Sequence, residues 1–150
     1  MEIIDIFFNL DVMRRAFPIL MRGLLNTILL GASAIFFGGI LGVLVCLVRL
    51  YAAKPFRLLA VLYTDIFRAI PVLVVLILVY YALPFAGIVF SSFVGATIAL
   101  ALVLAAYTAE VVRAGIEAVP RGQFEACDAL GLSFFTTMRK VILPQAFRMM

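Results

Sequence analysis

The feature that most constrains this chain is a stretch from residue 69 to residue 109 that contains no charged side chain. A membrane-spanning helix needs about 20 apolar residues, so this stretch is too long for one span and long enough for two. The sequence therefore predicts a helical hairpin with spans at 60–83 and 91–112. Pro71 could bend the first of these spans or be tolerated there as packing. Residues typical of turns lie near the middle of the stretch: Pro84, Gly87, Ser91 and Ser92.

Composition supports an all-α integral membrane protein. Hydrophobic residues make up 67% of the chain and charged residues 13%, whereas soluble domains are about half apolar and about a quarter charged. A further apolar run, Leu24–Val48, lies between Arg22 and Arg49 and predicts the first of three spans. As a helix it would be roughly 37 Å long, which allows it to tilt in the bilayer.

The first predicted span carries small residues at every fourth position, namely Ala34, Gly38 and Gly42. Such a row lets the backbone of another helix approach closely. Glycine is also common in membrane helices without a special role. The regular spacing of three small residues favours a helix-packing face.

The ends of the chain are expected to lie on opposite sides of the membrane. Residues 1–19 mix apolar and charged side chains without a clean helical stripe, which predicts a short interfacial segment ahead of a membrane domain at 20–150. Basic residues in the 49–57 loop and in the tail after Arg113 predict that these regions face the cytoplasm and that the N-terminus lies outside. Three basic residues near the N-terminus count against this orientation: Arg14, Arg15 and Arg22.

Two charged pairs with a spacing of three residues lie near predicted span ends. They are Asp65 with Arg68, and Glu110 with Arg113. Charges within the membrane are costly and often functional, so a gate or a substrate contact is one interpretation. The favoured interpretation is an interfacial pair whose side chains extend to water.

Several function classes are disfavoured by what the sequence lacks. It has no histidine and no GxxxxGK[ST] phosphate-binding loop, so we expect no bound cofactor, no metal site and no catalysis in this chain. Cys46 and Cys127 are expected at different depths, as reduced thiols. The net charge of +4 follows from basic residues at span ends, so nucleic acid is not an expected partner.

The polar tail predicts two short helices joined by a sharp corner. Arg121–Leu130 forms the first, with Gly131 as its left-handed C-terminal cap. Ser133 is placed to cap the start of the second helix, which Pro144 should stop or kink.

The same tail resembles the EAA loop of bacterial ABC-importer permeases, in which EAA, three residues, Gly, nine residues and I-x-L-P follow one another. Here the stretch reads EACDALGLSFFTTMRKVILP, with Cys127 in place of the second alanine and Val141 in place of isoleucine. The flanking stretch AYTAEVVRAGIEAVPRGQFEA is similar to the polar amino acid branch of these permeases, as are YTDIFRAIP and VILPQAFR. The resemblance covers roughly residues 20–150.

The resemblance implies part of a type I ABC importer transmembrane fold in the bacterial inner membrane, with the last two of about five spans missing from this chain. It implies a second permease subunit, identical or different, an extracytoplasmic substrate-binding protein, and a cytoplasmic ATPase dimer that binds ATP and Mg²⁺. The EAA loop would couple to that ATPase. The residues expected in the coupling loop are Phe124, Glu125, Ala126, Cys127, Gly131, Leu143 and Pro144.

A secondary transporter or channel that works without an ATPase is the alternative. Its expected mark is ionisable residues deep within the spans. The charges of this chain cluster near the predicted span ends instead.

Overall fold

The computed structural model describes residues 9–149, which form helices joined by short turns, without a strand in that range. The longest helix, α2 (Leu10–Tyr51), begins at Asn9, whose side chain accepts hydrogen bonds from the amides of Asp11 and Val12. It contains the whole predicted span 24–48 and is long and apolar enough to cross a membrane. Residues 10–19 belong to this helix, and their interfacial location stays a prediction; residues 1–8 lie outside the described range.

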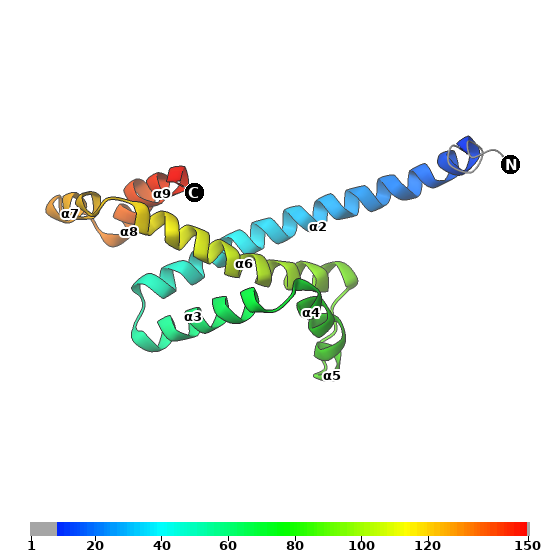
Figure 1. Ribbon diagram of the computed structural model, residues 1–150, viewed down its shortest axis with the longest axis horizontal. Coiled ribbons are helices and arrows are strands. Elements are labelled where there is room, and N and C mark those ends of the chain that lie inside the picture. The colour runs from blue at the N-terminus through cyan, green and yellow to red at the C-terminus, as the bar shows by residue number, and fades with distance from the viewer. Residues whose placement is uncertain (1–8, 150) are drawn as a thin grey trace.

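Helix α6 (Ser92–Ala118) begins one residue after the start of the third predicted span, 91–112, covers the rest of it, and is also apolar enough to cross a membrane. It lies along α2 over much of its length (Figure 1). A side chain added at Gly38 would meet Ala101 and Leu104, and one added at Gly42 would meet Ala105 and Thr108. Because the residue numbers of the contacts on α6 increase as those on α2 increase, the two helices run in the same direction.

Small residues on both helices produce this close approach. The predicted row on α2 is buried and faces a second row of small residues on α6. A Cβ atom at Gly42 would lie 2.8 Å from the carbonyl oxygen of Ala105, so the two backbones come together where only glycine fits. The row on α6 is Ala101, Ala105 and Ala109, all buried.

The predicted span 60–83 is not one straight helix. Helix α3 (Lys54–Ala69) ends before Pro71, and the segment Val72–Phe85 leaves it at an angle of 105°. Ile70 adopts an extended backbone, as expected because a proline disfavours helical geometry in the residue before it. The two parts together form a third candidate span that is broken at Pro71. Since α2 and α6 are parallel, this broken span returns the chain between them.

Two prolines are accommodated by locally widened turns. Segment 72–85 consists of α4 (Val72–Ile77), the π-helical η1 (Leu78–Ala82) and α5 (Leu83–Phe85). After η1, the amide of Leu83 donates to the carbonyl of Leu78, five residues back. Pro84 cannot donate to a carbonyl four residues back, and its ring would collide with that group in a regular helix. The wider turn gives the ring room.

The same device lies before Pro144, and it corrects the prediction that this proline would stop the second tail helix. Helix α8 (Phe134–Thr137) continues through η2 (Met138–Ile142) into α9 (Leu143–Met149). The amide of Leu143 donates to the carbonyl of Met138. The helical path therefore passes through Pro144 by way of a π-helical turn.

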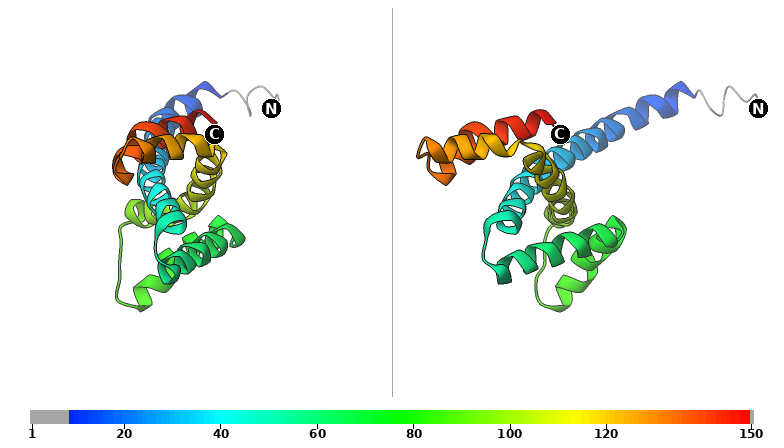
Figure 2. Two further views of the ribbon diagram at one scale, coloured as in Figure 1. Left: turned by 90° about the vertical axis from the view of Figure 1, so that its left-hand side faces the viewer. Right: turned by 60° about the vertical axis from the view of Figure 1, so that its left-hand side comes forward.

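Two apolar cores hold these elements together. One lies where α2, α6 and the tail meet and includes Cys46, Val112 and Ile142. The other joins α4 and η1 to the first half of α6 through Val75, Val79 and other apolar residues. Figure 2 shows the tail helices and the 72–85 segment on opposite sides of the α2–α6 pair.

Candidate functional site

The tail forms a corner whose geometry depends on one glycine. Helix α7 (Arg121–Ala129) follows Pro120, and Gly131 has a φ of +65°. The amide of Gly131 donates to the carbonyl of Asp128, and the amide of Leu132 donates to that of Cys127. These two bonds define a Schellman motif, which satisfies carbonyls at the end of the helix. The predicted left-handed cap is confirmed.

Helix α7 turns part of its surface outward. Glu125, Ala126 and Asp128 are exposed, and Leu130 is 75% exposed. Phe124 is half-buried and packs against the core shared with α2 and α6. Cys127 is buried, so its thiol faces the protein rather than the exposed surface.

The second tail helix is anchored to the membrane helices. Ser133 caps its start by accepting from the amide of Thr136, as predicted. Met138, Ile142 and Ala146 are buried in the core with residues of α2 and α6. Tyr51, at the end of α2, places its hydroxyl 3.8 Å from the sulfur of Met138.

The two arms of the corner also contact each other. Gln145 on α9 donates a hydrogen bond to Gln123 on α7 over 3.1 Å. Leu143 packs against the same core, whereas Pro144 is exposed. The tail is thus a rigid corner with one arm fixed to α2 and α6 and the other turned outward.

A cluster of charged side chains joins three helices close to this corner. Glu110 of α6 pairs with Arg49 of α2 through one carboxylate oxygen. Its other oxygen accepts two hydrogen bonds from Arg113, at 2.8 and 3.0 Å. Arg49 also donates to the hydroxyl of Thr64 on α3, over 3.0 Å. Only 15% of the Glu110 side chain is exposed, so this carboxylate is the centre of a largely buried network.

The cluster changes the interpretation of the two predicted charge pairs. Glu110 and Arg113 do pair. Arg68 instead reaches across to Glu110 over 3.4 Å, and Asp65 is exposed and forms no ion pair within the described part of the chain. Arg49 and Thr64 were missed from the sequence. The signal available for Arg49 was its place at the end of an apolar run.

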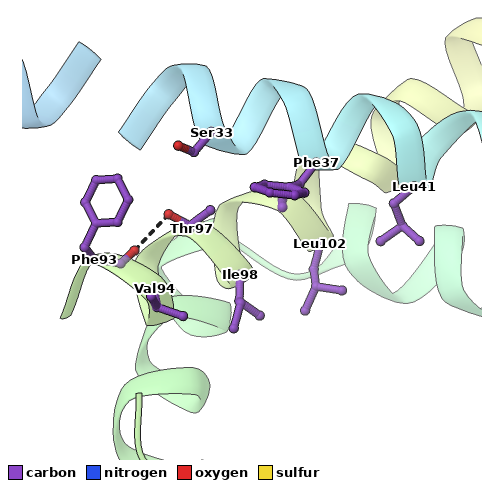
Figure 3. A pocket seen from close by; sticks show the side chains of 9 residues that line it. Ser33, Phe37, Leu41, Phe93, Val94, Thr97, Ile98 and Leu102 are labelled. Atoms are coloured by element: carbon purple, nitrogen blue, oxygen red, sulfur yellow. Dashed lines mark hydrogen bonds between the residues drawn. The ribbon is translucent and has the colours of Figure 1, made fainter. Parts of the chain in front are cut away.

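An apolar pocket with a volume of about 500 Å³ lies between α2 and α6 (Figure 3). Its lining is apolar except for Ser33 and Thr97. The Thr97 hydroxyl donates to the carbonyl of Phe93 over 2.8 Å and is therefore already satisfied. The pocket offers little to orient a polar ligand. Over residues 9–149, no three His, Cys, Asp or Glu side chains gather in a way that could hold a metal ion.

Comparison with known proteins matches this chain to membrane components of transport systems. A family model described as "Binding-protein-dependent transport system inner membrane component" matches residues 34–150. The probable amino-acid ABC transporter permease protein YckA of Bacillus subtilis (strain 168) is 38% identical over 144 residues, covering 96% of this chain and 64% of that protein. The putative glutamine transport system permease protein GlnP of Rickettsia bellii (strain RML369-C) is 42% identical over 130 residues, covering 86% and 60% respectively.

A solved structure agrees with these sequence relatives. In the crystal structure of an amino acid ABC transporter with histidines, one chain matches with a TM-score of 0.79 and 37% identity, covering 91% of this chain and 64% of that one. The chain thus spans between 60% and 64% of the length of these three proteins.

Proposed function

Because the chain belongs to the family of binding-protein-dependent transport system inner membrane components, we propose that it forms part of the permease subunit of an ATP-driven amino acid importer. The subunit itself is non-catalytic. ATP and Mg²⁺ are bound and hydrolysed by a cytoplasmic ATPase dimer. A second permease subunit completes the path, and an extracytoplasmic binding protein delivers the substrate, a polar amino acid.

The observation that carries this proposal is the construction of the tail. Coupling to an ATPase requires a stiff element that converts movement of the partner into movement of membrane helices. The outward arm, α7, presents Glu125 and Ala126, and the inward arm is fixed to α2 and α6 by Met138, Ile142 and Ala146. A push on α7 is therefore transmitted to both membrane helices.

Glu125 is the residue of this arm best suited to recognise the ATPase. It is exposed and forms no ion pair within the described range. It is the fifth residue of α7, beyond the first turn, which contains no acidic residue. A basic group in a groove of the ATPase would complement it.

The test is ATP-dependent uptake of labelled amino acids by proteoliposomes that contain the full-length permease, its ATPase and its binding protein. Gly131→Val forces a β-branched residue into positive φ, which strains the corner although nothing lies within 4 Å of the added Cβ. We expect uptake to fall at least about tenfold while ATP hydrolysis continues, since a distorted tail corner would no longer transmit movement of the ATPase to the membrane helices. Gly122→Ala is the matched control, because that site is also open and has no positive φ.

Two results would contradict the proposal at different points. Wild-type uptake by the Gly131→Val permease would show that the corner does not couple. Uptake driven by an ion gradient without any ATPase would show that the protein is a secondary transporter or channel.

A further inference from the structure

A second groove lies at the crossing of α2, α4 and α6. It has a volume of about 270 Å³. Its walls come from Gly31 and Ile35 of α2, from Val72 of α4, and from Leu100, Leu104 and Tyr107 of α6. All the walls are apolar apart from the Tyr107 hydroxyl. The groove is therefore suited to a hydrocarbon chain rather than to a polar solute.

The guanidinium group of Arg68 lies next to Tyr107, which lines one end of this groove. The guanidinium carbon of Arg68 lies 5.9 Å from the centre of the Tyr107 ring. Arg68 is four residues before Val72, across the bend at Pro71. Its side chain is 42% exposed, so a ligand in the groove would reach it.

Arg68 has unused hydrogen-bonding capacity. It contacts Glu110 at 3.4 Å as an ion pair, but it donates no hydrogen bond to any residue of the described range. Both Glu110 oxygens are already held by Arg49 and Arg113. The planar guanidinium of Arg68 is therefore available to bind an oxyanion through two of its donors.

The local charge balance favours an anion. Three guanidinium groups, from Arg49, Arg68 and Arg113, meet two carboxylates, from Glu110 and Glu117. One positive charge remains. Asp65, three residues before Arg68 on the same helix, forms no ion pair with it.

The arrangement is amphipathic along the membrane normal. Arg49 lies two residues before the end of α2, and arginines at span ends mark the membrane interface. From Tyr107 to Leu100 the groove follows α6 for about 10 Å away from that level, toward the middle of the span. A phosphate bound to Arg68 and joined to a hydrocarbon chain in the groove would occupy both the cationic and the apolar part of the site. A free anion would occupy only the cationic part, and an apolar helix only the groove.

We propose that the crevice formed by Arg68, Tyr107 and the adjoining groove binds an anionic phospholipid, with its phosphate on Arg68 and one acyl chain between α2 and α6. The site does not depend on transport or on the ATPase. A bound lipid would also brace α3 and α4 against α6 at the bend before Val72.

The test is native mass spectrometry of the purified full-length protein in detergent, titrated with phosphatidylglycerol or phosphatidylcholine carrying the same acyl chains. We expect one phosphatidylglycerol to be retained at a concentration at which phosphatidylcholine is not. Arg68→Gln should weaken retention roughly tenfold, equivalent to the loss of one charge-assisted contact. Arg57→Gln is the matched control, because it removes an exposed charge from the same helix away from the groove.

The acyl half of the site is tested independently of the charge. Gly31→Leu places a side chain at the wall of the groove, where nothing lies within 4 Å of the added Cβ, and it should also weaken retention several-fold. Gly23→Leu, at an equally open site of α2 outside the groove, should not. Each variant is compared only if it elutes as a single species. If Arg68→Gln does not, then Gly31→Leu decides the outcome.

Four results would overturn the proposal. The wild-type protein retains no lipid because protein covers the groove. Arg68→Gln or Gly31→Leu binds as well as wild type. Arg57→Gln weakens phosphatidylglycerol retention as much as Arg68→Gln does, which would mean that the lipid is attracted by surface charge in general and not by this site. Glycerol phosphate without acyl chains displaces the lipid at equal concentration, which assigns the crevice to a soluble phosphate.

Discussion

The carboxylate of Glu110 pairs with the guanidinium of Arg49, which joins α6 to α2 beside the start of the tail corner. Replacing Glu110 by Gln removes the charge and leaves both Arg49 and Arg113 with a weaker partner. Because the site is largely buried, we expect the free energy of unfolding to fall by about 2 kcal/mol. Equilibrium unfolding in mixed detergent micelles would measure it.

Glu117→Gln provides the comparison for that variant. Glu117 is 52% exposed, and within residues 9–149 it pairs only with Arg113, over 2.6 Å. Solvent screens such a pair, so its loss should cost less than about 1 kcal/mol. Equal effects of the two substitutions would show that the buried network around Glu110 has no special weight.

The α2–α6 contact predicts opposite outcomes for two glycines of one helix. A Cβ at Gly42 would lie 2.5 Å from the Cβ of Thr108, so Gly42→Ala must push the helices apart. We expect a loss of about 2 kcal/mol from overpacking. Gly39→Ala meets nothing within 4 Å and should be neutral or slightly stabilising, since alanine favours a helix more than glycine does. The same unfolding assay separates them, and a loss at Gly39 as large as that at Gly42 would contradict the packing argument.

Two buried threonines give a third comparison. Thr64 is fully buried, accepts from Arg49 and donates to the carbonyl of Val61 over 2.8 Å. Thr64→Val should therefore cost about 1 to 2 kcal/mol. The hydroxyl of Thr137 is buried without a hydrogen-bond partner in the described range. Thr137→Val keeps the shape and removes an unsatisfied group, so its melting temperature should equal or exceed that of wild type. A lower value for Thr137→Val would mean that this hydroxyl is bonded in the assembled transporter.

Much of the architecture could be predicted because local rules decide it. The charge-free stretch 69–109 predicted two spans joined by a turn. The spacing of Ala34, Gly38 and Gly42 predicted a packing face, which the structure buries against α6. Gly131 could be predicted as a helix C-cap because the left-handed backbone conformation at such a position, here a φ of +65°, strongly favours glycine. The role of Gly131 in coupling remains a prediction.

What sequence reasoning missed depends on distant contacts. Pro71 was predicted either to bend the span 60–83 or to be tolerated there, and local sequence could not decide between the two or give the 105° angle of the break. Arg68 was expected to pair with Asp65, three residues earlier, but it forms an ion pair with Glu110 instead because three helices converge there. Pro144 was expected to stop or kink its helix. The helix does not stop there, and the widened turn that lets it continue leaves no pattern in the sequence.

The anchoring of the second tail arm gives the last prediction. Ile142 is fully buried in the core shared with α2 and α6, so Ile142→Ala leaves a cavity that should cost about 2 to 4 kcal/mol. The loss should fall on the tail, because α2 and α6 keep their own contact through Gly38 and Gly42. Hydrogen exchange measured by mass spectrometry should then quicken in 133–149 and stay unchanged in the α2–α6 interface. Phe135→Ala, on the same arm but 68% exposed, should leave exchange unchanged in both regions. Faster exchange throughout the protein in Ile142→Ala would instead mean that tail and membrane helices unfold as one unit.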